Sequence, residues 1–178
     1  DGSLLKTLKG HKDSIRCVAQ MKWKRDSNTL LSGASDKTIK IWDITTGDCI
    51  KSLIGHSDSV YSLDYIRWEK NDTTIVSASY DKTLKVWDID KGNCIKTLSG
   101  HTHYVNRCLQ LKWDGEETVV VSCSFDKSIR LWNLDNGKMM KQLKGHSDYV
   151  MGLNQLKTNK DFITLISGSG DNSVKIWE

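Results

Sequence analysis

Apolar and polar residues alternate along short stretches of this chain, and these stretches return every 45 residues. The clearest stretch covers residues 38–42 (TIKIW), with copies at 83–87, 128–132 and 173–177. A period of two, with β-branched residues and Trp at the apolar positions, is typical of a half-buried β-strand. An Asp-Lys or Asp-Asn pair before each stretch suits a tight turn. The pattern therefore predicts a repeated unit built from strands.

Three more strands are predicted in each unit. A strand such as 60–65 begins the unit, an apolar strand such as 74–79 precedes the turn, and a strand such as 49–53 closes the unit. No Pro occurs in the chain, so Gly, Asn and Asp must form the turns. We expect an all-β chain with four short strands in each unit and no long helix.

The repeat is marked by residue types that keep one period. Gly-His pairs, Ser, Asp and Trp each recur four times at intervals of 45 residues. Self-similarity at such a period indicates a stacked repeat protein, since one unit cannot bury both of its faces alone. We place the units at residues 10–54, 55–99, 100–144 and 145–178, and we assign residues 1–9 to an outer strand of the last unit.

The composition of the chain limits where the protein can be located and which ligands it can bind. The net charge of +4 is a mild excess, which suits a solvated surface better than a nucleic-acid patch. No apolar run has membrane-spanning length, and no signal-peptide pattern begins the sequence. The five Cys have no metal-ligand spacing, and we expect Cys49, Cys94 and Cys123 to be small core residues in a reducing compartment. We therefore expect an intracellular, cytoplasmic protein that binds no metal, cofactor, nucleic acid or membrane.

These residues resemble the WD-repeat (β-transducin-like) family, whose blades run from Gly-His to Trp-Asp over about 40–45 residues. Trp42-Asp43 and Trp87-Asp88 match fully, whereas Trp132-Asn133 and Trp177-Glu178 depart at the last residue. The resemblance covers the whole chain. It implies one β-propeller, or half of one, over residues 1–178, made of four-stranded antiparallel blades.

The resemblance also implies a buried hydrogen-bonded tetrad of His, Ser, Asp and Trp in each blade. The matching sets are His11-Ser32-Asp36-Trp42, His56-Ser77-Asp81-Trp87, His101-Ser122-Asp126-Trp132 and His146-Ser167-Asp171-Trp177. Ser, His and Asp also form hydrolase triads. Four copies with one spacing and a Trp partner favour a structural role, because catalytic sites are not built in quadruplicate. We expect no catalytic residues and no enzyme activity.

Family members usually contact partners through one face, called the top face, at three positions in each blade. The positions three residues after the His are Ser14, Ser59, Tyr104 and Tyr149. The positions five residues after it are Arg16, Tyr61, Asn106 and Met151. The residues before the Asp are Ser35, Tyr80, Phe125 and Gly170. Four of the five Tyr in the chain fall on these positions, and Tyr, Arg and Met are typical interface anchors.

The resemblance therefore implies an interaction scaffold that binds proteins or peptides. Arg16 is the one cation among these positions, which disfavours recognition of phosphate by an Arg cluster. One alternative is an accessory or substrate-recognition domain of an enzyme complex such as a ligase, a kinase or a signalling ATPase. A structural or engineered propeller is another, although the variation among the units favours a natural array.

Two features leave the architecture open. Residues 4–8 align with the fourth strand of a unit, and the last unit lacks that strand. The first strand can then complete the same chain as a four-blade ring, complete a second chain in an eight-blade ring, or belong to a longer array; we favour the last two. A Trp also lies twelve residues after each of the first three His, at Trp23, Trp68 and Trp113, with Thr158 in the fourth unit. We expect these indoles to cap the outside of their blades.

Overall fold

The computed structural model describes residues 1–20, 28–68, 71–112, 117–156 and 163–178. All the regular structure in these residues is β, which confirms the all-β prediction. The strands are β1 (Ile15–Gln20), β2 (Thr29–Ala34), β3 (Thr38–Asp43), β4 (Cys49–Ile54), β5 (Val60–Trp68), β6 (Asn71–Ser79), β7 (Thr83–Asp88), β8 (Asn93–Ser99), β9 (Val105–Gln110), β10 (Val119–Ser124), β11 (Ser128–Asn133), β12 (Met139–Lys144), β13 (Val150–Leu156), β14 (Thr164–Ser169) and β15 (Val174–Trp177). No helix of these residues is long and apolar enough to cross a membrane.

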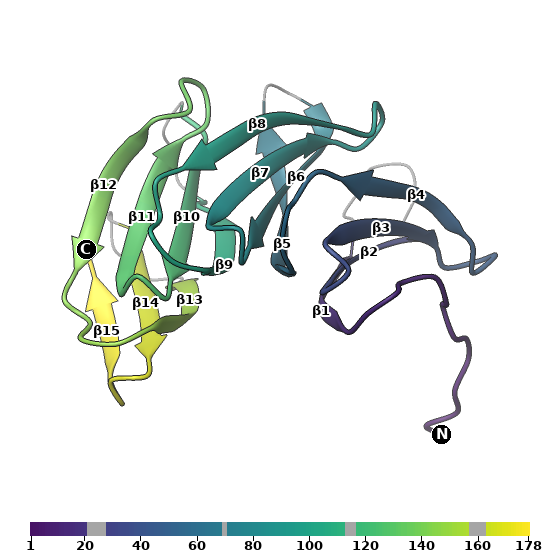
Figure 1. Cartoon of the computed structure of the whole chain (residues 1–178), viewed down its shortest axis with the longest axis horizontal. Helices are drawn as coiled ribbons and strands as arrows, with labels where there is room; N and C mark the ends of the chain where they lie inside the picture. Colours follow the sequence, from purple (N-terminus) through teal and green to yellow (C-terminus); the bar gives the residue numbers. More distant parts are fainter. Residues whose placement is uncertain (21–27, 69–70, 113–116, 157–162) are drawn as a thin grey trace.

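The strands form four antiparallel sheets that follow one another along an arc (Figure 1). Blades 1, 2 and 3 are the four-stranded sheets β1–β4, β5–β8 and β9–β12, and blade 4 is the three-stranded sheet β13–β15. The first strands of neighbouring blades, β1, β5, β9 and β13, contact one another. The two chain termini lie at opposite ends of the arc, so the chain does not close on itself as a four-blade ring.

The turn between the second and third strands of each blade follows the predicted Asp-Lys or Asp-Asn signal. The residue after the Asp has a left-handed backbone, with φ of 69° at Lys37, 72° at Lys82, 68° at Lys127 and 63° at Asn172. Its amide donates to a residue three positions earlier, as in the 3.2 Å bond from Lys82 N to the Ser79 carbonyl. This turn brings the tetrad Asp close to the strand that follows it.

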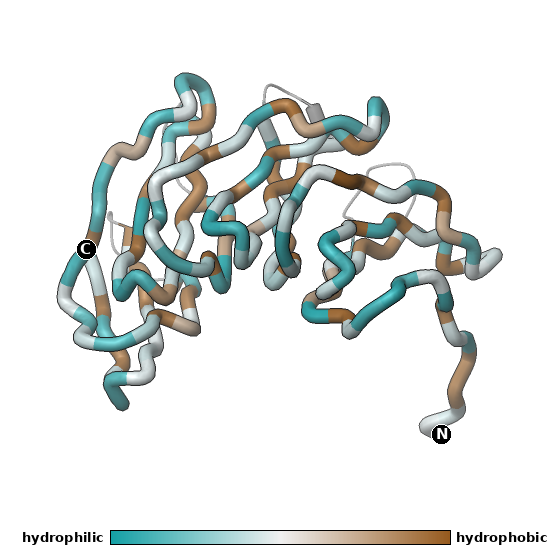
Figure 2. Tube along the Cα trace, viewed as in Figure 1, coloured by the Kyte–Doolittle hydropathy of each residue, from teal (hydrophilic) through white to brown (hydrophobic). Residues whose placement is uncertain are grey.

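The hydrophobic core lies between the blades. One cluster joins blades 1 and 2 through Ile39, Ile41 and Val60, and similar clusters join blades 2 and 3 and blades 3 and 4. Each blade therefore buries its apolar residues against its neighbour, as expected for a stacked repeat. Figure 2 shows the alternation of hydrophobic and hydrophilic residues along the strands, and a hydrophobic stretch in the N-terminal tail.

A lysine on the fourth strand of one blade is hydrogen-bonded to the next blade. Lys51 on β4 donates to the carbonyls of Ile89 and Asp90, at 2.9 and 2.7 Å, in the turn that follows β7. Lys96 on β8 makes the same two bonds to Leu134 and Asp135 in blade 3. We call this contact the lysine clamp. Two charge-assisted bonds per clamp add to the apolar burial between neighbouring blades.

The lysine clamp explains a glycine in each receiving turn. Gly47, Gly92 and Gly137 have positive φ values of 90°, 73° and 71°. A Cβ on Gly92 would lie 3.2 Å from Cδ of Lys51, and the same approach recurs at the other two glycines. The turn therefore needs Gly both for its left-handed backbone and for the passage of the lysine stem.

Three expectations differ from the structure. Residues 1–9 form no strand, so the last sheet keeps three strands within this chain. Trp68 is buried between blades 2 and 3 and does not cap the outside of its blade, while Trp23, Trp113 and Thr158 lie outside the described residues. Cys49 is exposed and Cys94 is half-buried, because the fourth strand in which they lie is the outermost one; Cys123 is buried as expected.

Candidate functional site

The structure brings together all four members of each predicted tetrad. In blade 2, His56 Nδ1 lies 2.6 Å from Asp81 Oδ2, and His56 Nε2 lies 2.7 Å from Ser77 Oγ. Trp87 donates its indole N–H to Ser77 Oγ at 2.8 Å. The other three blades repeat these contacts within 2.7–2.8 Å. The residues therefore satisfy one another inside the blade, with the rings of His56 and Trp87 edge to face at 5.8 Å.

The tetrad Asp is held as a carboxylate. Burial alone would raise the pKa of Asp81, but hydrogen bonds from His56, the Thr83 hydroxyl and the Ser57 amide hold it well below its usual range. Burial lowers the pKa of His101 in spite of Asp126 beside it, so the imidazole stays neutral. With Asp126 accepting from Nδ1, Nε2 of His101 accepts from the Ser122 hydroxyl. The serine oxygen thus donates to the His, accepts from the Trp, and is fully engaged within the tetrad.

Aromatic side chains from blades 2, 3 and 4 lie against one another on one face of the arc. Tyr80 stacks on Tyr61 at 3.8 Å between ring centroids and 3° between planes, and on Tyr104 at 4.1 Å and 5°. Phe125 stacks on Tyr149 at 4.6 Å and 10°. The two stacks meet where Tyr104 lies 6.0 Å from Phe125. We call these five residues and His103 the aromatic ladder.

The ladder is positioned by the tetrad loops. In each blade, the residue before the tetrad Asp donates its amide to the carbonyl of the residue three after the His. Tyr80 N donates to Ser59 O at 3.0 Å, and Phe125 N donates to Tyr104 O at 3.0 Å. The same bond joins Ser35 to Ser14 and Gly170 to Tyr149. Because the tetrad fixes the His and the Asp, it also fixes the loops that carry the rings.

The ladder rings are half-buried, apart from Tyr149, which is exposed. The stacked rings cover one another's faces, and the hydroxyl groups of Tyr80 and Tyr61 are hydrogen-bonded to each other. Burial and the neighbouring Tyr61 hydroxyl raise the pKa of Tyr80, which therefore stays a neutral phenol. An aromatic cage needs free ring faces to surround a cation. The ladder instead forms a rigid strip suited to apolar and hydrogen-bonding contact.

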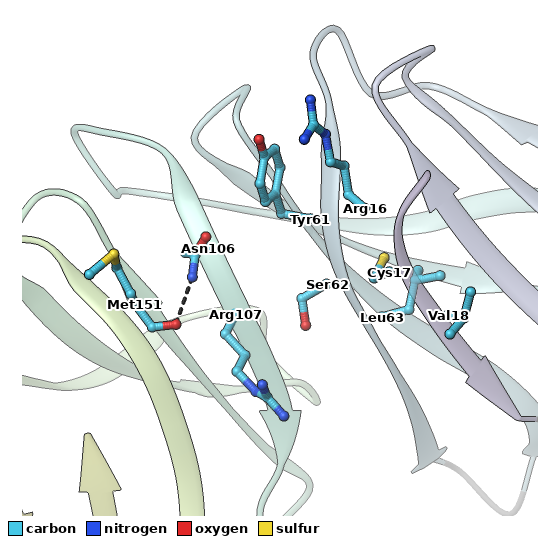
Figure 3. Close-up of a pocket in the computed structure, with 9 residues that line it drawn as sticks. All are labelled: Arg16, Cys17, Val18, Tyr61, Ser62, Leu63, Asn106, Arg107 and Met151. Atoms are coloured by element: carbon cyan, nitrogen blue, oxygen red, sulfur yellow. Dashed lines mark hydrogen bonds between the residues drawn. The ribbon is translucent and has the colours of Figure 1, made fainter. Parts of the chain in front are cut away.

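A cleft of about 310 Å³ adjoins the ladder and is lined by the first strands of all four blades (Figure 3). It contains all four residues predicted five positions after the His: Arg16, Tyr61, Asn106 and Met151. Asn106 donates to the Met151 carbonyl at 2.7 Å. Arg16 lies with its guanidinium 5.3 Å from the Tyr61 ring centroid and donates Nε–H to Ser35 Oγ at 2.7 Å. The ladder and the cleft therefore share Tyr61 and form one continuous surface.

The cleft carries a positive charge. Arg16 and Arg107 are both among its nine lining residues, and none of the nine is acidic. Asp64 lies close enough to Arg107 for the guanidinium to oppose the rise of its pKa that burial causes. The cleft therefore favours an anionic group beside Arg16.

Sequence reasoning missed His103 and Arg107. His103 occupies the place held by Asp13, Asp58 and Asp148 in the other blades, and like them it accepts the amide of the next residue, at 2.8 Å. A break in the repeat at this position was the available signal. Arg107 is found only from the way that β9 faces the cleft. Among the predicted positions, Ser14, Ser35, Ser59 and Gly170 add backbone and hydroxyl groups but no ring.

Nothing in the described residues suggests a bound metal, since no group of three His, Cys, Asp or Glu side chains is arranged to hold one. The serines of the tetrads are enclosed by their partners, as in the buried Ser77. A buried hydroxyl bonded to both an imidazole and an indole cannot reach a substrate. The ladder and the cleft together consist of aromatic, amide, thioether and guanidinium groups.

A family described as WD domain, G-beta repeat matches this chain four times, at residues 2–43, 47–88, 92–133 and 137–178. The second, third and fourth matches each contain the fourth strand of one blade and the first three strands of the next. Residues 2–43 contain the N-terminal tail and strands β1–β3. The sequence repeat is therefore offset from the structural blade by one strand.

Known proteins share single repeats with the chain. The WD repeat-containing protein 89 homolog of Dictyostelium discoideum is 49% identical over 49 residues, which is 28% of this chain and 13% of that protein. The probable E3 ubiquitin ligase complex SCF subunit sconB of Penicillium rubens is 41% identical over 44 residues, which is 25% of this chain and 6% of that protein. The chain thus spans a small part of these curated relatives.

A solved structure matches almost the whole chain. The WD40 beta propeller domain of Doa1 superposes with a TM-score of 0.79 and 27% identity, covering 95% of this chain and 52% of that one. The arc of four blades therefore corresponds to about half of that propeller chain.

Proposed function

We propose, from the premise that this chain belongs to the WD domain, G-beta repeat family, that it is an interaction module which holds a segment of a partner protein along the aromatic ladder and the cleft. The observation that carries the proposal is the convergence of the first strands of all four blades on one cleft. Tyr61, Asn106 and Met151 come from three different blades and line one cleft with Arg16. Residues of these types anchor protein interfaces.

The stacked rings favour an extended peptide. The ladder is ordered before binding, so little side-chain entropy is lost when a partner contacts it. Tyrosine hydroxyls along the strip offer hydrogen bonds to a peptide backbone. The guanidinium groups of Arg16 and Arg107 favour a carboxylate in the segment that enters the cleft. Phosphate recognition is a weaker candidate, since the carboxylate of Asp64 lies near Arg107.

A second candidate is an accessory or substrate-recognition domain within a ubiquitin ligase. This candidate is supported by the likeness of one repeat to the probable E3 ubiquitin ligase complex SCF subunit sconB. It uses the same contact surface, and the ligase chemistry would come from other chains. In both readings the chain itself is not an enzyme and works inside the cell.

Binding to an immobilised library of random peptides tests the proposal. We expect the wild-type chain to select segments that combine apolar residues with Asp or Glu. Tyr80→Ala removes the centre of the first stack and should weaken binding more than tenfold. Tyr80→Phe keeps the stack and serves as the matched control, with less than a threefold loss.

The charge is tested separately. Arg16→Ala should weaken binding of the acidic segments, and the effect should shrink as salt rises, because exposed charges are screened. Selection of no peptide by the wild-type chain, or equal binding by Tyr80→Ala and the wild type, would contradict the proposal.

A further inference from the structure

One side chain of the aromatic ladder breaks the 45-residue repeat in a way that changes its chemistry. The residue two positions after the tetrad His is Asp13 in blade 1, Asp58 in blade 2 and Asp148 in blade 4, but His103 in blade 3. All four side chains accept the amide N–H of the next residue, at 2.6, 2.7, 2.8 and 2.8 Å. A carboxylate keeps this ability in mild acid, whereas an imidazole keeps it only while it is neutral.

The bond from Tyr104 fixes the position of the proton on His103. Nδ1 of His103 accepts the Tyr104 amide, so the neutral ring carries its proton on Nε2. A second proton can be added only at Nδ1, which faces an N–H donor 2.8 Å away. Rotation of the ring by half a turn gives no acceptor either, because it places a carbon, Cδ2, where Nδ1 was. The arrangement in this structure therefore suits the neutral ring alone.

The backbone around His103 is held by bonds that do not involve the imidazole. The carbonyl of His103 accepts from the Ser124 hydroxyl at 3.1 Å, and the carbonyl of Tyr104 accepts from the Phe125 amide at 3.0 Å. Blades 2 and 4 have bonds equivalent to the first of these. Because none of these groups titrates, the loop stays in place when the imidazole takes up a proton. The side chain must therefore move and not the backbone.

The imidazole of His103 lies where the two stacks of the ladder meet. Its centroid is 4.4 Å from that of Tyr104 in the first stack, with the rings edge to face at 83°. It is 5.8 Å from Phe125 and 5.9 Å from Tyr149, which form the second stack. A rotation that separates Nδ1 from the Tyr104 amide takes the ring away from these neighbours. The ladder then loses a ring that contacts both of its stacks.

The charged groups around His103 are engaged with other partners. Asp126, in the turn between β10 and β11, is bonded to His101, and Lys127 in the same turn donates to a carbonyl of blade 4 at 2.8 Å. Asp148, on the loop of blade 4, accepts the amide that follows it. The other titratable groups against the ring are the phenols of the two ladder tyrosines. Within the described residues, no ion pair therefore holds a charged His103 in the ladder.

We propose that His103 is a proton-sensitive positioning residue: as a neutral imidazole it joins the two stacks of the ladder, and on protonation its ring leaves them. Histidine is the side chain whose charge ordinarily changes between about pH 5 and 8. The surface for the partner segment is then complete at neutral pH and incomplete in mild acid. The consequence for binding rests on the proposed function, whereas the movement of the ring does not.

Nuclear magnetic resonance of the ¹⁵N-labelled chain between pH 7.5 and 5 tests the movement. At pH 7.5 we expect the ring proton of His103 on Nε2, with cross-relaxation between the His103 and Tyr104 rings. As the ring takes up a second proton, the cross-relaxation should fall by at least half, and the Tyr104 amide should shift with the same midpoint. A proton on Nδ1 at pH 7.5 would overturn the proposal. An imidazolium that keeps its ring contacts, held by cation–π attraction, would also overturn it.

Two matched variants exchange the acceptors between blades. His103→Asp gives blade 3 the residue type of the other blades, so the Tyr104 amide should no longer titrate in this range. Asp58→His should transfer the pH dependence to the Ser59 amide, which Asp58 accepts at 2.7 Å. Both variants retain the tetrad His101. A Tyr104 amide that still titrates in His103→Asp would assign the effect to His101 and overturn the proposal, as would a Ser59 amide that stays constant in Asp58→His.

Peptide affinity at the two pH values tests the consequence for binding. The probe is a peptide without histidine that the wild-type chain selects from the random library at pH 7.5. We expect its dissociation constant to rise at least fivefold at pH 5 for the wild type and less than twofold for His103→Asp. An equal rise for both proteins would overturn the regulation of binding. Selection of no peptide at pH 7.5 would overturn the proposed function, and the resonance titration would still decide whether the ring moves.

Discussion

Trp68 in blade 2 donates its indole N–H to the carboxylate of Asp135 in blade 3, at 2.9 Å. The ammonium of Lys96 lies 5.0 Å from the same ring, and this lysine also binds the Leu134 and Asp135 carbonyls. The Trp68 side chain, at the end of β5, therefore contacts both the lysine of the clamp and the turn of blade 3 that receives this lysine. The indole that we expected on the outside of its blade is a joint between blades.

Trp68→Phe should lower the free energy of unfolding by about 1–2 kcal/mol, because the ring is kept but one hydrogen bond and part of the cation–π attraction are lost. Urea denaturation measures this change. Asp135→Asn keeps a side-chain oxygen as acceptor and should cost less than about 0.5 kcal/mol as the control. A Trp68→Phe protein as stable as the wild type would show that the bond to Asp135 contributes nothing.

Asp81→Ala should destabilise the chain by about 3 kcal/mol, since His56, Thr83 and the Ser57 amide all lose an anionic acceptor. For a chain of this size, the melting temperature should fall by roughly 6–12 °C. Asp90→Ala, in an exposed turn, is the control and should change the melting temperature by less than about 2 °C. An unchanged melting temperature for Asp81→Ala would refute a structural role for the tetrad.

Stability should fall as the pH falls below 6.5. The pKa of His101 is lowered in the folded chain by burial, so the unfolded chain takes up a proton near pH 6.5 while the folded chain resists it. The tetrad carboxylates change the stability of the fold at lower pH than His101 does. Their pKa values are held below the usual 3.8, so their contribution is present above that pH and is lost as the pH falls further.

Urea midpoints between pH 7.5 and 3 measure both steps, each with a slope of at most about 1.4 kcal/mol per pH unit for one group. His101→Gln has no imidazole at this position and should show a flatter dependence between pH 7 and 5. A wild-type stability that rises from pH 7 to pH 5 would contradict the neutral state of His101.

Thr74→Val should stabilise the chain by about 1 kcal/mol. The hydroxyl of Thr74 is buried without a hydrogen-bond partner among the described residues, and blade 3 has Val119 at the same position. Valine has the same shape and removes the cost of desolvating the hydroxyl. Thr83→Val is the opposite case, because its hydroxyl donates to Asp81 at 2.6 Å, and it should destabilise. Thermal unfolding of both variants, with shifts of the same sign, would contradict this reasoning.

The repeat period and the alternation predicted most of the fold, because each strand has one buried face and the same residues recur in each blade. The alternation of residues 83–87 corresponds to β7, and the loop before it carries Tyr80 into the ladder. The stacking of the rings could not be predicted from the sequence, because it depends on the rotation of one blade relative to the next. Contacts between blades, such as Trp68 with Asp135, were missed for the same reason.

The lysine clamp escaped prediction although Lys6, Lys51, Lys96 and Lys141 keep the 45-residue period. Its acceptors are main-chain carbonyls, so the receiving turn has no characteristic side chain to reveal it. Arg107 was missed because only the position of β9 beside the cleft gives it a role. Sequence patterns report what a residue does within its own unit far better than what it does to a neighbour.

The lysine clamp binds main-chain carbonyls, so it does not depend on the side chains of the residues that accept it. This has a consequence for how such proteins evolve. The receiving turns read Ile-Thr, Ile-Asp and Leu-Asp in the three blades, yet all of them accept the same lysine. A gene segment duplicated, lost or exchanged in multiples of 45 codons would therefore bring the lysine and its receiving turn with it, as long as the turn keeps its glycine. The loops of the aromatic ladder are then free to diverge under selection for new partners while the array stays assembled.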